Sequence, residues 1–116
     1  MTVEVFQGPP RTSLEEVAGR LRGPLQRIGA HRAYVFGSYA TGTADRYSDL
    51  DLLIVAPTEL GPFERARLLP EAWELGVAVD VLFYTPSEWD ELVARGSPLA
   101  TRILDEGRLI HERPES

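Results

Sequence analysis

Gly37 and Ser38 stand ten residues before a pair of aspartates, Asp49 and Asp51. The glycine ends a short aromatic and β-branched stretch, so the chain must turn there, and a residue without a side chain lets the backbone approach a ligand closely. The amides that follow, together with the Ser38 hydroxyl, can donate hydrogen bonds to phosphate oxygens. These residues therefore predict a phosphate-binding turn.

The two aspartates begin a strand pattern over residues 49–55. Side chains alternate across a strand, so the carboxylates of Asp49 and Asp51 project from one face and the intervening leucines from the other. A third aspartate, Asp80, interrupts an apolar strand pattern over residues 77–83, where an unpaired carboxylate is costly or takes up a proton. If the two strands are neighbours, three carboxylates converge.

Like charges this close require a cation between them. Hard oxygen ligands select magnesium or manganese over zinc, so we expect a magnesium site, with manganese as the alternative, at Asp49, Asp51 and Asp80. The chain has a net charge of −6, and an acidic protein that handles phosphates needs a divalent cation to offset its own repulsion. The residues thus predict metal-assisted phosphate chemistry.

The rest of the chain must position these groups. Hydrophobic periodicity, capping residues and prolines predict an α/β fold, with a small sheet flanked by helices, and leave parallel or mixed pairing open. The expected helices span about 13–29 with a capping box at Ser13 and a kink or break near Arg22, 62–75 with Phe63 and Trp73 facing inward and an interruption or kink at Pro70, 86–95 and 98–106. The expected strands span 33–36, 49–55, 77–83 and 108–112.

Length and composition narrow the function further. The 116 residues are expected to form one domain, 1–116, with its core at about 13–112. The absence of cysteine excludes a disulfide scaffold, a thiolate zinc site and a cysteine nucleophile. The basic residues are twelve scattered arginines, so autonomous nucleic-acid binding is not expected. The longest apolar run, 52–57, is strand-sized, so no membrane segment is expected and the cytoplasm is the expected location.

The order Gly37-Ser38, ten residues, Asp49-Leu50-Asp51 and a later Asp80 resembles the nucleotidyltransferases of the DNA polymerase β superfamily, and within it the minimal nucleotidyltransferases. The resemblance covers residues 13–112. It implies the small mixed sheet of the polymerase β-like fold and two metal ions that bridge the aspartates and a nucleoside triphosphate. It assigns metal binding and catalysis to the three aspartates and phosphate binding to the glycine and serine.

The segment between the turn and the aspartates departs from the family pattern. Family members often carry basic residues there, whereas this chain has Tyr39 and Thr41, and only Arg46 is a nearby cation. Arg46 is a candidate nucleotide-binding residue or a solvated surface residue. Tyr39 either covers the nucleotide or packs in the core. Trp73 and Trp89 lie on apolar helical stripes and are expected in the core or an interface.

The resemblance also implies an activity. Minimal members resemble antitoxins paired with HEPN-domain toxins, so we expect transfer of AMP from ATP to a hydroxyl, with a tyrosine of a HEPN partner as the favoured acceptor. Two alternatives stay open: transfer to a small molecule such as an aminoglycoside, by a homodimer that completes the acceptor pocket, and an antitoxin that acts by binding alone. The choice among nucleoside triphosphates is not determined by the sequence.

Overall fold

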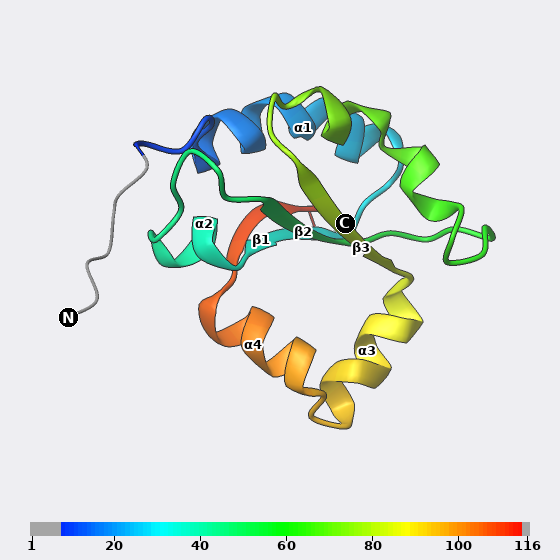
Figure 1. Ribbon diagram of the computed structural model, residues 1–116. Helices are drawn as coiled ribbons and strands as arrows, with labels where there is room; N and C mark the ends of the chain where they lie inside the picture. Colours follow the sequence, from blue (N-terminus) through cyan, green and yellow to red (C-terminus); the bar gives the residue numbers. More distant parts are fainter. Residues whose placement is uncertain (1–7, 115–116) are drawn as a thin grey trace.

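A four-stranded mixed sheet lies at the centre of the molecule (Figure 1). The computed structural model describes residues 8–114. The strands are β1 (Arg32–Phe36), β2 (Leu50–Val55), β3 (Val79–Tyr84) and β4 (Arg108–Glu112), in the spatial order β3-β2-β1-β4. β2 and the edge strand β3 are parallel, whereas β1 is antiparallel to both β2 and β4. This confirms the α/β class and shows that the pairing is mixed.

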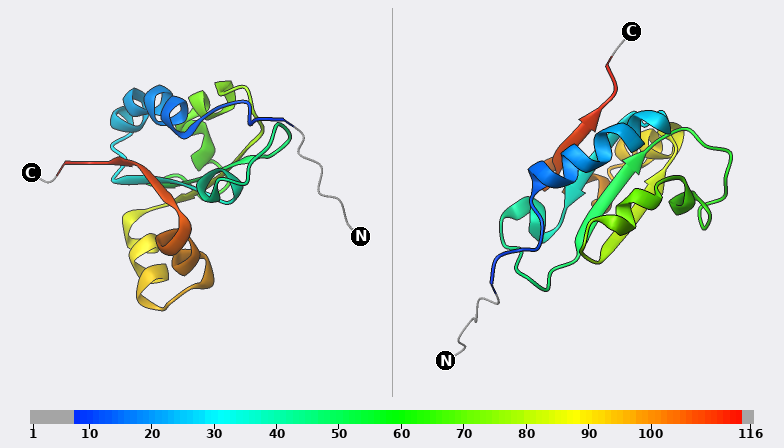
Figure 2. Two further views of the ribbon diagram at one scale, coloured as in Figure 1. Left: turned by 90° about the vertical axis from the view of Figure 1, so that its left-hand side faces the viewer. Right: turned by 90° about the horizontal axis from the view of Figure 1, so that it is seen from above.

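One face of the sheet is covered by α1 (Leu14–Arg27) and by the 3₁₀ helices η1 (Arg65–Leu68) and η2 (Pro70–Glu74) (Figures 1 and 2). The apolar residues of this face alternate along the strands with those of the other face, as strand geometry requires. The core between sheet and helices on this side is built by Val17, Leu21, Leu25, Ala33, Val35, Leu50, Leu52, Ile54, Leu69, Ala72 and Phe83, among others.

The opposite face is covered by α3 (Pro86–Ala94) and α4 (Pro98–Glu106) (Figure 1). Its smaller core consists of Tyr34, Phe36, Leu53, Val55, Trp89, Ala100 and Ile103. The Trp89 side chain is 4% exposed and packs in this core, with its ring 6.1 Å from that of Tyr34. We call this side of the sheet the α3–α4 face.

The first helix differs in two details from the expectation. Ser13 caps it by accepting the amide of Glu16, but the Glu16 carboxylate accepts the Thr12 hydroxyl at 3.0 Å, so the cap is not a reciprocal box. The helix also continues through Pro24 without the expected break. A proline removes only its own hydrogen bond to the carbonyl four residues earlier, and burial of Val17, Leu21 and Leu25 along one stripe outweighs that loss.

The α-helical type expected over 62–75 is wrong, whereas the interruption expected at Pro70 is confirmed. The structure has two short 3₁₀ helices there, because Pro70 has no amide to donate and the preceding Leu69 leaves the helical conformation, with φ −130° and ψ 64°. Leu69, Ala72 and Leu75 are buried, but the Phe63 side chain is fully exposed and Trp73 is 51% exposed. The inward orientation expected for Phe63 and Trp73 is therefore also wrong.

No helix within residues 8–114 combines the length and the apolar character needed to span a bilayer.

Candidate active site

Asp51 occupies the centre of a row of residues that crosses the sheet. It pairs with Phe36 on β1 and with Asp80 on β3. Residues paired across strands share a face, and Leu53 and Val55 of the same strand lie in the core of the α3–α4 face, so Asp51 and Asp80 project toward that side. The two strands that carry these aspartates are thus neighbours, as the hypothesis of converging carboxylates requires.

Asp49 lies immediately before β2 rather than inside it. Its side chain is exposed, as is that of Asp80, whereas Asp51 is half-buried. Asp51, which is two residues from Asp49 and pairs with Asp80, is therefore the least exposed of the three carboxylates. Solvent, or a ligand, can reach the outer two directly.

Gly37 allows the turn after β1 to approach Asp51. Its φ of 72° and ψ of −150° lie in a region that residues with a side chain avoid. A Cβ atom at this position would clash with Oδ2 of Asp51. The glycine is therefore required both by the conformation of the backbone and by the carboxylate that fills the space next to it.

A short helix that the sequence patterns did not predict follows the turn. It is α2 (Ser38–Thr41), begins at the half-buried Ser38 and ends at Gly42 in the left-handed conformation, with φ 77°. Four residues are too few to produce a helical hydrophobic period, which explains why it was missed. The turn and α2 place Ser38 next to the strand end that carries the Phe36–Asp51–Asp80 row.

Burial and neighbouring charges both act on the Asp51 carboxyl. Partial burial, then the nearby charges of Asp80 and Asp49, raise the pKa of the Asp51 carboxyl, while the guanidinium of Arg102 acts in the opposite direction. A raised pKa means that the ionised form is destabilised where it stands. A cation bound among these carboxylates would relieve that cost.

The donor set suits a hard divalent cation, because all three groups offer carboxylate oxygens. In the arrangement of side chains in residues 8–114, however, no group of three or more histidine, aspartate or glutamate side chains is gathered closely enough to hold a metal ion. The backbone brings the three aspartates to one region without closing their oxygens on a single point. Binding of a metal there requires rotation of side chains.

Arg46 lies on the exposed loop between α2 and β2. Together with Arg11, Ser48 and Asp49, it lines a small cavity of about 170 Å³. The Asp45 carboxylate orders this loop by accepting the amide of Tyr47 at 2.9 Å and the Ser48 hydroxyl. The structure therefore places Arg46 beside Asp49.

Tyr39 packs in the core. It is 6% exposed and belongs to the cluster beneath α1, and burial raises the pKa of its hydroxyl. Of the two interpretations from the sequence, packing is the one that agrees with its position.

Arg102 is a residue near the site that the sequence analysis missed. It lies on α4, and its guanidinium carbon is 6.0 Å from the centre of the Phe36 ring, next to Asp51 in the row. The sequence does show that Arg102 flanks the apolar stripe of Leu99, Ala100 and Ile103. It does not show that α4 crosses the end of β1, which is a long-range property.

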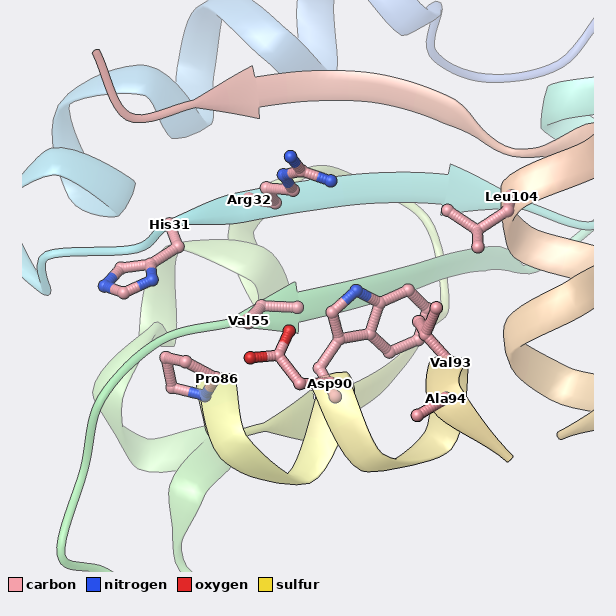
Figure 3. Close-up of a pocket in the computed structure, with 9 residues that line it drawn as sticks. His31, Arg32, Val55, Pro86, Asp90, Val93, Ala94 and Leu104 are labelled. Atoms are coloured by element: carbon pink, nitrogen blue, oxygen red, sulfur yellow. The ribbon is translucent and has the colours of Figure 1, made fainter. Parts of the chain in front are cut away.

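A larger cavity, of about 500 Å³, lies elsewhere (Figure 3). It is bordered by the start of β1, the end of β2 and the helices α3 and α4, and Val55 and Trp89 contribute to its wall. None of the residues predicted for the site lines it. The candidate site is thus the open region around the aspartates.

Comparison with known proteins identifies the family. Residues 18–110, most of the chain, match the family described as nucleotidyltransferase domain. This chain belongs to that family. Nucleotidyltransferases generally use divalent metals, which agrees with the carboxylate chemistry of the site. A search of curated protein sequences finds no match.

Solved structures show the same fold. One described as a minimal nucleotidyltransferase is 33% identical to this nucleotidyltransferase, with a TM-score of 0.58, and covers 84% of this chain and 96% of its own. A chain of a toxin–antitoxin complex with AMP-PNP is 23% identical, with a TM-score of 0.62 and coverage of 83% and 73%. A chain of the Shewanella oneidensis complex between a tri-AMPylated HEPN toxin and an MNT antitoxin is 18% identical, with a TM-score of 0.57 and coverage of 86% and 73%.

Proposed function

We propose that this nucleotidyltransferase transfers AMP from ATP to a hydroxyl, in a metal-dependent reaction, and that the acceptor is a tyrosine of a HEPN-domain partner protein. The observation that carries the proposal is the pairing of Asp51 with Asp80 on one face of the sheet, beside the Gly37 turn. Family membership supports nucleotidyl transfer. The AMPylated HEPN toxin in a similar complex supports the acceptor class.

The reaction is a displacement at phosphorus. The acceptor oxygen forms a bond to the α-phosphorus of ATP, the bond from that phosphorus to the bridging oxygen of the β-phosphate breaks, and pyrophosphate leaves. The acceptor proton passes to the Asp80 carboxylate, which is exposed and adjacent to Asp51. When bound, magnesium supplies the positive charge that this reaction requires among carboxylates and phosphates.

The turn of Gly37 and Ser38 binds the phosphate groups of ATP. Its backbone can approach the triphosphate because no side chain intervenes, and Ser38 offers a hydroxyl and an amide at the start of α2. Asp49 and Asp51 would hold the metal, and Asp80 would bind the metal and take the acceptor proton. Arg46, which lines the same small cavity as Asp49, would contact the nucleotide.

A protein acceptor also accounts for the openness of the site. Asp49 and Asp80 are exposed, so residues 8–114 alone do not exclude water from the reacting atoms. A second protein surface that docks over the α3–α4 face would exclude it and would hold one hydroxyl in line with the α-phosphorus. Alignment of this kind lowers a barrier by up to about 7–11 kcal/mol.

The test combines purified chain, labelled ATP and magnesium with a candidate HEPN-domain partner and, as the alternative acceptor, an aminoglycoside. We expect the partner to gain the mass of AMP on a tyrosine, and Asp49→Asn to abolish this while Glu91→Gln, an equal loss of charge on the exposed side of α3, does not. An unmodified partner together with a labelled aminoglycoside would contradict the protein acceptor. Neutralisation of the partner that survives Asp49→Asn would contradict catalysis as its cause.

Asp80 has a separate test. Asp80→Asn is expected to reduce AMP transfer by more than about a hundredfold while it changes the dissociation constant of magnesium-ATP by less than about threefold, because the triphosphate rests on the other groups. Transfer rates and calorimetry on the same preparation measure both. A variant that loses stability but keeps its transfer rate per folded molecule would show that Asp80 is structural.

A further inference from the structure

Few cations near the phosphate-binding turn are free to hold a triphosphate. Within residues 8–114, α2 carries no basic residue. The Nε of Arg108 donates to the carbonyl of Ala40 at 3.2 Å, so that side chain is already occupied in fixing α2 to β4. Arg46 lies on the side of the small cavity next to Asp49. A nucleoside triphosphate bound at Gly37 therefore lacks a cation from the turn itself.

Arg102 enters this region from α4. Its guanidinium lies over the ring of Phe36, at 6.0 Å from the ring centre. Phe36 directly precedes Gly37 and pairs with Asp51, so the guanidinium lies above the end of β1, beside both the turn and the central carboxylate. Figure 1 shows α4 under the end of the sheet that carries α2.

The surroundings of Arg102 leave its hydrogen-bond donors available. The guanidinium carbon lies over the 8% exposed Phe36 ring, a contact that uses none of the N–H donors of Arg102. Its ion pair is with Glu106 on the same helix, at 3.8 Å, and both side chains are more than half exposed. Exposed pairs of this geometry are weak, so a phosphate can displace the carboxylate.

We propose that Arg102 is a catalytic residue that binds the triphosphate at Gly37 and stabilises the negative charge of the departing pyrophosphate. This rests on the proposed nucleotidyl transfer and adds its phosphate-binding cation. The flat guanidinium can donate two parallel hydrogen bonds to a phosphate, which an ammonium cannot. In this chain the cation comes from the C-terminal helix, in place of the basic residues that the turn lacks.

The test measures binding of two probes, magnesium-ATP and magnesium-tripolyphosphate, by calorimetry. Arg102→Ala is expected to weaken both by at least about tenfold, because a charge-assisted hydrogen bond is lost, and Arg102→Lys to restore part of the affinity. Arg95→Ala, an equal change of charge at the exposed end of α3, is the matched control and should change neither. Glu106→Gln frees Arg102 and should tighten binding of both probes.

The outcomes separate this proposal from the proposed function. If wild type binds magnesium-ATP and Arg102→Ala binds both probes within about twofold of Arg95→Ala, the role of Arg102 is overturned and nucleotidyl transfer stands. If the Arg102 variants weaken binding as expected but the wild type labels no acceptor, the binding of triphosphate by Arg102 stands, whereas nucleotidyl transfer and the catalytic part of this proposal are overturned. If the wild type binds neither probe, both proposals are overturned. Unfolding curves of each variant establish that the affinities refer to folded protein.

Discussion

A single missing side chain decides how closely the chain can bring its turn to Asp51. Gly37 combines a positive φ with a neighbour that leaves no space for a Cβ atom, whereas Gly42 has a positive φ of 77° and open space around it. These two glycines border α2 on either side. Comparison of the two positions separates the cost of backbone strain from the cost of displacing the carboxylate.

Gly37→Ala should lower the free energy of unfolding by about 1–3 kcal/mol from the backbone conformation, with a further loss because Asp51 must move. Gly42→Ala should lower it by about 1–2 kcal/mol, from the backbone alone. Chemical denaturation of both variants measures the difference, and calorimetry should show that Gly37→Ala also loses magnesium-ATP affinity. Equal effects of the two substitutions on stability and binding would contradict the contact between Gly37 and Asp51.

At the scale of elements, a buried arginine joins η1 to α3. Arg65 is 6% exposed and donates to the carbonyl of Phe83 and to both carboxylate oxygens of Glu88, the closer at 2.5 Å. The same carboxylate accepts the amide of Thr85 and completes the capping box of α3. Hydrogen bonds from Arg65 and then Thr85 lower the pKa of Glu88 to about 2. One glutamate therefore both starts α3 and neutralises a buried charge.

Glu88→Gln should reduce the free energy of unfolding at pH 7 by about 2 kcal/mol, the scale of a hydrogen bond to a charged group. The folded pKa of Glu88 lies below its ordinary value of 4.5, so the carboxylate's contribution is complete above that pH and is lost as the pH falls from 4.5 toward 2. Denaturation at several pH values should show the difference from wild type shrinking over this window, and Glu91→Gln should show no such trend. A difference independent of pH would contradict the role of this ion pair.

The same element shows what the sequence can predict. The cap at Thr85 and Glu88 involves residues three apart, so its pattern is local and the helix start was predicted correctly. The alternation of side chains along β2, which determines the face from which Asp51 projects, is a local pattern as well. By contrast, the 3₁₀ helices around Pro70 and the four-residue α2 are too short to produce a helical repeat of hydrophobic residues in the sequence. The position of Arg102 over Phe36 depends on packing between residues far apart in the chain, which no local pattern encodes.

At the scale of the whole molecule, the net negative charge opposes the binding of anionic ligands such as nucleotides. The chain carries a net charge of −6, and three of its aspartates, Asp49, Asp51 and Asp80, are those of the proposed triphosphate site. Burial, followed by the charges of Asp80 and Asp49, raises the pKa of Asp51, so repulsion from these neighbours adds to the cost of burying its carboxylate. Binding of a nucleotide therefore requires a compensating cation, either bound to the nucleotide beforehand or already present at the site.

Nucleotide binding is accordingly expected to depend on the divalent ion. Calorimetric titration with ATP should give measurable heat in magnesium or manganese and at least about tenfold weaker binding in a chelator. Sodium chloride at matched ionic strength is the control, because screening alone also weakens repulsion between exposed charges. Equal affinity in chelator and in magnesium would contradict the metal site at the aspartates.

The parallel pairing of β2 and β3 also sets the order in which the site can form during synthesis. Asp51 and Asp80 become neighbours only through a pair of strands with a long connection between them, and Arg102 and β4 emerge from the ribosome later still. A nascent chain that has completed the Gly37 turn and Asp49-Leu50-Asp51 thus holds the recognisable motif but neither its third carboxylate nor the guanidinium over Phe36. Under the proposed function, affinity for the nucleotide is therefore expected only late in synthesis, after most of the sheet is available.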